Sequence, residues 1–386
     1  MENLNNIEVS VVIPCLNEED TIGICIDKIQ RAFAKHNLSG EVVVVDNGCT
    51  DKSVEISVAK GARVLVETKK GYGNALRKGI EEANGKFVVM ADGDDTYDFE
   101  IIDQFLEKLR AGADLVMGSR FKGEILKDAM SWSHRYIGNP ILSGMLKLFF
   151  GGGVSDAHCG LRAFTKKAYN NMKLKTQGME FASEMVIHAL KEGIKIEEIS
   201  IKYYPRKGES KLNSVRDAWR HIRFMLLYSP KYLFLIPGIL MFLVGIYLTL
   251  HIFIKPIVMF GRGWDIHVMV LSSMMAILGW QVFTMGLMAK SYINKIGLEK
   301  DKLTSKFFDF FRFFERLNLE IFIGLGILVF VFGMALVAKI FLVWYLHNFG
   351  ALDQIKTGIL ATMLIVIGAQ TIFSGFLVSV IKIEYK

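Results

Sequence analysis

Three closely spaced aspartates are the residues of this chain whose chemistry is easiest to interpret. Asp92, Asp94 and Asp95 follow the short apolar run at 87–90. Carboxylates this close repel one another unless a cation shares their site. Magnesium and manganese suit such a place, because these hard ions take one or two carboxylates and complete their shell with substrate phosphates. The alternative is an acidic turn in which Asp94 or Asp95 caps the next helix.

The elements that must position these aspartates follow from an alternation of apolar runs and helical patterns up to about residue 228. Continuous apolar runs predict buried strands, and the segments between them predict helices. This βαβα order predicts a mainly parallel sheet with helices on both faces. The strands are expected at 9–13, 41–45, 63–66, 87–90 and 115–117, and the helices at 21–35, 51–60, 73–83 and 99–111.

Polar clusters follow three of these predicted strands. Asn17 and Glu18 lie just after the first strand, Asp46 and Asn47 end the second, and the acidic triplet follows the fourth. In parallel sheets, ligands bind outside the carboxyl ends of the strands, where the strand order reverses. The expected convergence of these clusters favours a binding site over an isolated acidic turn.

Two common nucleotide-binding motifs do not occur in the sequence. No G-x-G-x-x-G follows the first strand, and no G-x-x-x-x-G-K-[ST] is found, which disfavours a dinucleotide fold and a P-loop. The run Gly71-Tyr72-Gly73 opens a predicted helix. It either brings backbone N–H groups near a phosphate or forms an ordinary glycine turn.

The second half of the chain is strongly apolar. The 386 residues are 52% hydrophobic, with a mean hydropathy of +0.33. Four stretches reach the length of about 20 mainly apolar residues that a bilayer requires. We therefore expect an integral membrane protein with spans at 232–254, 268–289, 321–344 and 358–381.

Basic residues flank these spans unevenly. They are concentrated before the first span, between the second and third, and after the last. The positive-inside rule therefore predicts a cytoplasmic location for both termini and the middle loop. The first residues lack the basic and apolar regions of a signal peptide, so no cleaved signal is expected. The net charge of +7 fits an anionic leaflet of a cell or endoplasmic-type membrane better than a nucleic acid.

Several motifs, in order, resemble those of family 2 inverting glycosyltransferases of the GT-A fold. A second set makes the chain similar to the polyprenyl- or dolichyl-phosphate sugar synthases, over about residues 9–230. The first set is Pro14-x-x-Asn17-Glu18, Asp46 with Thr50-Asp51, the glycine-rich stretch 71–79, and the D-x-D of Asp92 and Asp94. The second set is Gly118-Ser119-Arg120, the run Ser-Asp-Ala-His-Cys-Gly-Leu-Arg at 155–162, Gly178-Met179-Glu180-Phe181, and Tyr204-Pro205-Arg206-x-x-Glu209-Ser210-Lys211.

The resemblance implies a role for individual residues. Asp92, Asp94, Arg120 and Arg206 would be catalytic, and Asp92 and Asp94 would hold Mg²⁺ or Mn²⁺. The donor, a UDP- or GDP-sugar, and the phosphates would be bound by Pro14, Asn17, Glu18, Asp46, Gly73, Asp92, Arg135, Glu180, Ser210 and Lys211. The sequence departs from the family pattern at Asn47, Asp95 and Thr96.

The activity that the resemblance implies is transfer of a hexose from the nucleotide sugar to undecaprenyl or dolichyl phosphate on the cytoplasmic leaflet. Such an acceptor is already ionised, so it needs positioning, for which arginine forks are suited. The expected organisation is a cytoplasmic GT-A domain at 1–212, an amphipathic interface helix at 213–230 and a transmembrane domain at 231–386. The helical pattern at 307–317 predicts a second interface helix.

Two other functions remain open at this point. A processive polysaccharide synthase would share the fold, but its typical Gln-x-x-Arg-Trp motif does not occur in the sequence. A lipid-linked sugar flippase or scaffold with an inactive transferase domain would not need the intact Asp92 and Asp94 pair. A homo-oligomer is also left open, and no nucleic-acid partner is expected.

Overall fold

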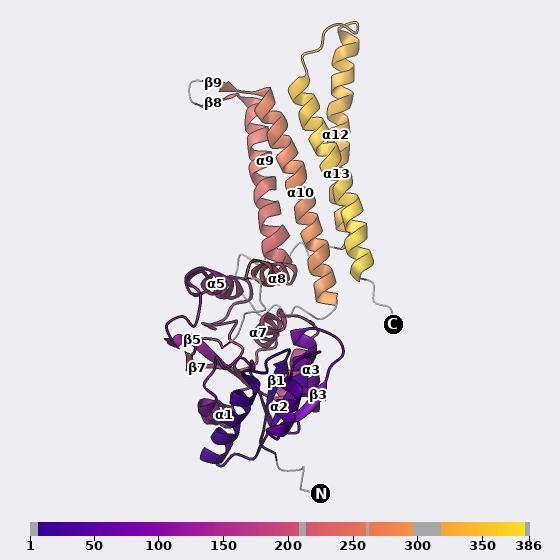
Figure 1. Ribbon diagram of the computed structural model, residues 1–386. Coiled ribbons are helices and arrows are strands. Elements are labelled where there is room, and N and C mark those ends of the chain that lie inside the picture. The colour runs from indigo at the N-terminus through magenta and orange to yellow at the C-terminus, as the bar shows by residue number, and fades with distance from the viewer. Residues whose placement is uncertain (1–6, 208–213, 260–261, 296–317, 383–386) are drawn as a thin grey trace. The chain divides into compact units, whose positions relative to one another are not determined.

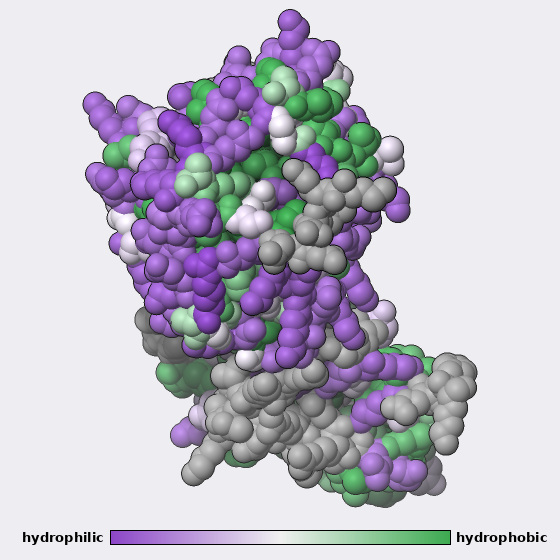
Figure 2. Space-filling view, turned by 90° about the horizontal axis from the view of Figure 1, so that it is seen from below, coloured by the Kyte–Doolittle hydropathy of each residue, from purple (hydrophilic) through white to green (hydrophobic). Residues whose placement is uncertain are grey.

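The protein forms two compact units, residues 1–225 and 226–386, in a computed structural model (Figure 1). The structure describes residues 7–207, 214–259, 262–295 and 318–382. In the view of Figure 2, hydrophilic residues cover most of the face of the first unit. This surface fits contact with water.

A seven-stranded sheet lies at the centre of the first unit, in the order β3-β2-β1-β4-β6-β5-β7. Strand β6 runs antiparallel to β4 and β5, and the other neighbours are parallel. This mixed, mainly parallel sheet confirms the predicted fold class. The strands are β1 Val9–Cys15, β2 Gly40–Asp46, β3 Arg63–Val66, β4 Phe87–Met90, β5 Leu115–Ile125, β6 Arg162–Thr165 and β7 Ile196–Tyr203.

The helices between the early strands agree with the sequence pattern to within a few residues. A 3-10 turn, Phe99–Ile101, precedes α4, which shortens the α-helical part of the segment predicted at 99–111. Strand β5 is longer than predicted, because residues beyond Gly118 continue to pair with β7 across an irregularity in register. The helices of this unit are α1 Ile22–Lys35, α2 Ser53–Ala59, α3 Tyr72–Glu82, α4 Ile102–Arg110, α5 Asn139–Phe150, α6 Lys166–Met172, α7 Phe181–Glu192 and α8 Ser214–Leu227.

The strand order reverses at β1, which lies between β2 and β4. Residues of β1 and β4 such as Val11, Ile13 and Val89 are completely buried, in a core cluster that also contains residues of α1 and α4. This apolar core fixes the strand ends of β1, β2 and β4 beside one another. The polar residues that follow these strands are therefore brought to the same edge.

The second unit contains four long apolar helices, each long enough to cross a membrane. They agree with the four predicted spans. A small antiparallel hairpin, β8 Ile257–Met259 and β9 Arg262–Trp264, follows the first of them. The spans are Lys231–Ile254, which contains α9 Ile236–Ile254, then α10 Ile266–Lys295, α12 Leu319–Leu346 and α13 Ile355–Lys382. The second predicted interface helix, 307–317, lies outside the described residues.

Candidate active site

Asp92 follows β4 and is held by two tyrosine hydroxyls. Tyr72, the first residue of α3, donates to Oδ1 at 2.9 Å, and Tyr97 donates to Oδ2 at 3.3 Å. The Tyr97 hydroxyl in turn accepts a hydrogen bond from the backbone N–H of Gly160 at 2.9 Å. Asp92 is therefore fixed by groups from α3, the turn after β4 and the loop before β6.

The charge of Asp92 is poorly compensated. Burial raises the pKa of its carboxyl to about 6, and the nearby negative charge of Asp94 adds to this rise. The hydrogen bonds from Tyr72 and Tyr97 act in the opposite direction and do not outweigh it. Two neighbouring carboxylates with too little positive charge form a place that favours a cation.

Asp94 meets a positive side chain from another part of the chain. Arg206, which follows β7, approaches Asp94 Oδ2 with Nη1 at 3.5 Å and Glu18 Oε1 with Nη2 at 2.9 Å. The other Asp94 oxygen accepts a hydrogen bond from the Thr96 hydroxyl at 2.6 Å. Thr96, one of the departures from the family pattern, therefore orients the second carboxylate of the D-x-D.

The two carboxylates fit a divalent cation of the magnesium type. Such an ion needs only one or two protein carboxylates when substrate phosphates supply the remaining ligands. Among the described residues, no group of three or more His, Cys, Asp or Glu side chains is arranged to hold a metal by itself. The donor set thus fits an ion that binds together with a nucleotide diphosphate, and Asp92 and Asp94 would hold it.

The predicted nucleotide-binding residues after β1 and β2 join two loops. Asn17 accepts a hydrogen bond from the Thr50 N–H at 2.7 Å, and Glu18 donates its N–H to Ser53 at 2.8 Å. Asp46 Oδ1 accepts from the N–H groups of Gly48 and Cys49. Burial acts to raise the pKa of Asp46, but these hydrogen bonds outweigh it and lower the pKa. Pro14 lies near the end of β1, opposite Val45 of β2.

Gly73 lies at the start of α3, close to the backbone of residues 176–177. Its N–H donates to the carbonyl of Gln177 at 2.9 Å. A Cβ at this position would lie 2.5 Å from the carbonyl oxygen of Thr176. The N–H of Gly73 is therefore bound to another chain segment in this structure, and a role for Gly73 in binding the donor stays a prediction.

Asn47 has a structural explanation that the sequence did not supply. Its amide nitrogen donates to the carbonyls of Glu67 and Lys69, both at 2.9 Å, and its oxygen accepts from the Gly71 N–H at 2.7 Å. An aspartate could not donate to the two carbonyls. The asparagine thus ties the end of β2 to the segment that leads into α3.

Arg120 is buried and paired within the protein. Its guanidinium contacts the carboxylate of Asp156 through two nitrogens, at 2.6 and 2.8 Å, and lies 5.1 Å from the ring centre of Tyr203. Burial acts to lower the pKa of Arg120, but Asp156 outweighs it and raises the pKa. A role for Arg120 at a substrate phosphate stays a prediction.

The remaining predicted residues lie in other places. Arg135 is half-buried in the π-helical turn His134–Gly138, with its guanidinium 5.5 Å from the ring centre of Tyr136. Glu180 is the residue that precedes α7 and is also half-buried. Ser210 and Lys211 lie outside the described residues.

Arg162 is a site-supporting residue that sequence reasoning missed. It is completely buried, and its three guanidinium nitrogens donate to the carbonyls of Cys159, Ala182 and Ala157 at 2.7–2.8 Å. These bonds shape the loop that carries Gly160. The motif at 155–162 contains this arginine, but its type alone does not separate a buried structural arginine from one that binds phosphate.

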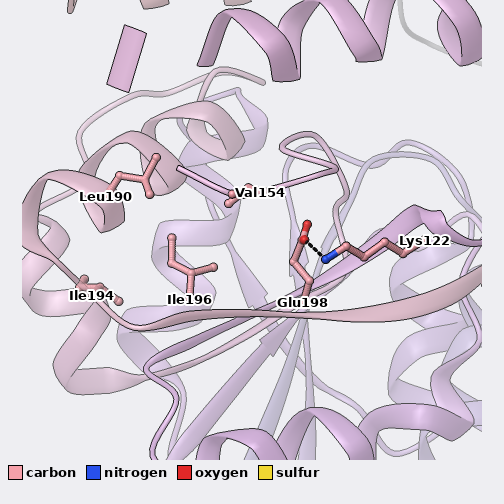
Figure 3. Close-up of a pocket in the computed structure, with 7 residues that line it drawn as sticks. Lys122, Val154, Leu190, Ile194, Ile196 and Glu198 are labelled. Atoms are coloured by element: carbon pink, nitrogen blue, oxygen red, sulfur yellow. Dashed lines mark ion pairs between the residues drawn. The ribbon is translucent and has the colours of Figure 1, made fainter. Parts of the chain in front are cut away.

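A separate pocket of about 350 Å³ lies between β5, β7 and α7 (Figure 3). Val154, Leu190 and Ile196 form apolar parts of its wall, and Lys122 and Glu198 form an ion pair of 2.6 Å beside it. None of the aspartates after β4 lines this pocket. The pocket is therefore distinct from the edge of the sheet that carries Asp92 and Asp94, called here the carboxylate edge.

Sequence comparisons identify the family. The model of glycosyl transferase family 2 matches residues 10–172. The low-salt glycan biosynthesis hexosyltransferase Agl6 of Haloferax volcanii is 38% identical over 370 residues, which are 96% of this chain and 88% of that protein. The chain belongs to glycosyltransferase family 2. The predicted family and enzyme class are thus confirmed, and the family 2 C-terminal transmembrane region, matched at 297–382, supports an integral membrane glycosyltransferase.

Two further proteins resemble this glycosyltransferase over part of its length. The dolichyl-phosphate hexose transferase of Haloferax volcanii is 32% identical over 207 residues, 53% of this chain and 87% of that protein. A crystal structure of glucosyl-3-phosphoglycerate synthase from Mycobacterium tuberculosis with Mn²⁺, UDP-glucose and phosphoglyceric acid is 21% identical. It aligns with 58% of this chain and 82% of that one, with a TM-score of 0.48.

The contact between Gly160 and Asp92 yields a prediction for the transferase. A Cβ at residue 160 would collide with Asp92 Oδ2 and would lie 2.9 Å from the Tyr97 hydroxyl. We expect Gly160→Ala to displace the carboxylate and reduce the kcat/KM of sugar transfer on the order of 100-fold. Gly153→Ala is the matched control, because a Cβ at that position would meet no neighbouring atom within 4 Å. Activity of Gly160→Ala as high as that of Gly153→Ala and of the wild-type protein would contradict the assigned position of Asp92.

Proposed function

We propose that this glycosyltransferase transfers one hexose from a UDP- or GDP-sugar to a polyprenyl phosphate on the cytoplasmic leaflet. The observation that carries the proposal is the pair of negatively charged carboxylates after β4, Asp92 and Asp94, with Arg206 next to Asp94. The same chain has four helices of membrane-spanning length. The names of the two Haloferax volcanii relatives, a hexosyltransferase and a dolichyl-phosphate hexose transferase, support this choice of substrates.

The chemistry follows from the charges of the substrates. A phosphate oxygen of the lipid attacks the anomeric carbon, and the bond from that carbon to the nucleotide diphosphate breaks. Bound Mg²⁺ or Mn²⁺ supplies charge neutralisation at the leaving diphosphate. Asp92 and Asp94 hold the donor end of the site, and Arg206 binds a phosphate of the donor or the acceptor. The lipid phosphate is already an anion, so no side chain has to remove a proton.

Two helices of the first unit offer surfaces suited to the headgroup region of a membrane. On α8, Trp219 is 57% exposed, and the next residue, Arg220, is also exposed. The turn before α5 and α5 itself expose Trp132, Tyr136 and Leu148. Aromatic and basic side chains of this kind are favoured at the boundary between lipid and water. We propose that both helices lie in the inner leaflet, where the polyprenyl phosphate headgroup is found.

The basic residues around the spans support the same side of the membrane. They are most frequent before the first span, between the second and third spans and at the C-terminal end. The positive-inside rule then gives a cytoplasmic location to the catalytic unit and both termini. This orientation gives the transferase access to nucleotide sugars, which are soluble.

Membranes that contain the full-length protein provide the test of the reaction. We expect one labelled UDP- or GDP-sugar to transfer its hexose to added polyprenyl phosphate, measured as label extracted with organic solvent. Asp94→Asn should reduce this transfer on the order of 100-fold or more, because the cation site loses a charge. Asp128→Asn is the control, since Asp128 is exposed. Label in a long polysaccharide would instead favour a processive synthase, and an unchanged rate in Asp94→Asn would contradict the metal site.

The interface helix yields a separate prediction. Trp219→Glu places a charge where α8 is proposed to meet the lipid headgroups. We expect this variant to lose activity roughly tenfold with a membrane-bound long-chain acceptor, but less than twofold with a short water-soluble polyprenyl phosphate. Val58→Glu is the control, because Val58 on α2 is similarly exposed at 59%. Equal losses of Trp219→Glu with both acceptors would contradict the contact of α8 with lipid headgroups.

A further inference from the structure

The segment that follows β7 is bound to the turn after β4 at several points. Tyr203 and Tyr97 form an isolated antiparallel bridge, and their ring centres are 5.6 Å apart. The N–H of Tyr204 donates to the carbonyl of Thr96 at 3.0 Å. This backbone pairing brings the next residues of the segment to the carboxylate edge.

Asp95 makes the side-chain part of this connection. It is only 4% exposed, and its two carboxylate oxygens contact the ammonium groups of Lys28 on α1 at 2.5 Å and of Lys207 at 2.8 Å. Burial acts to raise the pKa of Asp95, but the two lysines outweigh it and lower the pKa. Lys207 itself is 59% exposed, so the buried carboxylate is what gives this flexible side chain a fixed partner.

We propose that Asp95 is a positioning residue for Arg206. Lys207 is the next residue after Arg206, so the Asp95–Lys207 ion pair holds the backbone that carries the arginine. The guanidinium then stays at Asp94 and Glu18, where a substrate phosphate is expected. Since both oxygens of Asp95 contact lysines, the third aspartate serves this anchor, while Asp92 and Asp94 serve the cation. This inference rests on the proposed sugar transfer.

The backbone of Asp95 permits a clean substitution. Its φ of 60° lies in the left-handed region, which asparagine tolerates better than most residues. Asp95→Asn therefore removes the charge without adding backbone strain. Lys207→Gln removes the other member of the pair, and Lys35→Gln, also on α1, is the control because its ion-pair partner is Glu100.

Steady-state kinetics of the full-length protein in membranes test the proposal. We expect Asp95→Asn and Lys207→Gln each to raise the KM of one phosphate substrate roughly fivefold, with kcat within about twofold. Arg206→Gln should raise the KM of the same substrate, and adding Asp95→Asn to Arg206→Gln should have no further effect. Lys35→Gln should leave this KM within about twofold of the wild-type value.

The possible results separate the two proposals. If the wild-type protein transfers no sugar to a lipid phosphate, the proposed function fails. If it does so and Asp95→Asn has the wild-type KM, or lowers only the melting temperature and the active fraction, the positioning role is wrong. Additive losses in Asp95→Asn with Arg206→Gln would also contradict it, because they would mean that Asp95 acts independently of Arg206.

A different set of observations concerns the membrane unit. The pattern Gly-Ile-Leu-x-Phe-x-x-Gly occurs at 238–245 in α9 and again at 326–333 in α12. The pattern Gly-x-Gln-x-x-x-x-Gly occurs at 279–286 in α10 and again at 368–375 in α13. The two patterns thus appear in the same order in two successive pairs of helices.

The packing contacts of these glycines match between the two pairs. A Cβ on Gly238 would lie 2.5 Å from the backbone nitrogen of Phe283, and one on Gly326 would lie 2.9 Å from that of Ile372. Phe283 and Ile372 occupy the same position of the second pattern. A Cβ on Gly286 would likewise lie 2.8 Å from the Cβ of Phe234, and one on Gly375 would lie 2.6 Å from that of Phe322. Both phenylalanines precede the first pattern by the same interval.

We infer that the membrane unit is a tandem repeat of one helical hairpin, α9–α10 and α12–α13. In each copy, glycines let two backbones approach closely, which is how helices gain packing energy in lipid. The copies touch through α10 and α13, where the Trp280 N–H donates to the Thr371 hydroxyl at 2.9 Å. Because this inference concerns packing alone, it does not depend on the proposed reaction.

A paired exchange tests the repeat. Residues 238–245 and 279–286 are replaced together by residues 326–333 and 368–375, with Trp280 left in place. We expect the full-length protein in detergent to keep its melting temperature within about 5 °C, whereas Gly279→Leu and Gly368→Leu each lower it by about 10 °C or more. Gly358→Leu is the control, because a Cβ on Gly358 would have open space around it. An exchange that is as damaging as Gly279→Leu would overturn the repeat.

Discussion

The repulsion between Asp92 and Asp94 is the interaction on which the catalytic unit depends. Burial raises the pKa of Asp92 to about 6, and the negative charge of Asp94 adds to this rise. The surrounding groups compensate the negative charge of the two carboxylates only in part: two tyrosine hydroxyls donate to Asp92, and the Arg206 guanidinium pairs with Asp94. Such a pair of carboxylates is suited to bind a divalent cation together with a diphosphate. The cation neutralises the carboxylates, and the diphosphate oxygens complete its ligand shell.

The rest of the first unit holds this edge in place through parts of the chain that are far apart in sequence. Tyr72 comes from α3, whose start is fixed by Asn47 and the segment at 176–177. Gly160 comes from the loop that Arg162 shapes from inside. Arg206 reaches the edge because β7 and the turn after β4 pair through backbone hydrogen bonds. The carboxylates are therefore positioned by the sheet, and the segment after β7 supplies the positive charge.

Elements and ligands differ in how far the sequence predicts them. Continuous apolar runs such as 87–90 identify buried strands, because a strand covered on both faces has no polar side. The antiparallel β6, Arg162–Thr165, has only four residues and follows a motif that suggested chemistry, so no pattern identified it.

The roles of individual arginines are harder to predict from the sequence than the strands. Arg120, Arg162 and Arg206 have the same side chain, and only their partners distinguish a buried pair, a loop support and a residue of the carboxylate edge. The roles of Asn47 and Asp95 also depend on residues distant in the sequence, which spacing does not disclose.

Binding of Mn²⁺ to the full-length protein, followed by electron paramagnetic resonance, tests the central claim most directly. We expect tight binding of the ion to require a nucleoside diphosphate, UDP or GDP, and to be lost in Asp92→Asn. Mn²⁺ that binds equally well in that variant, or no binding with either nucleotide, would contradict a cation site at the end of β4.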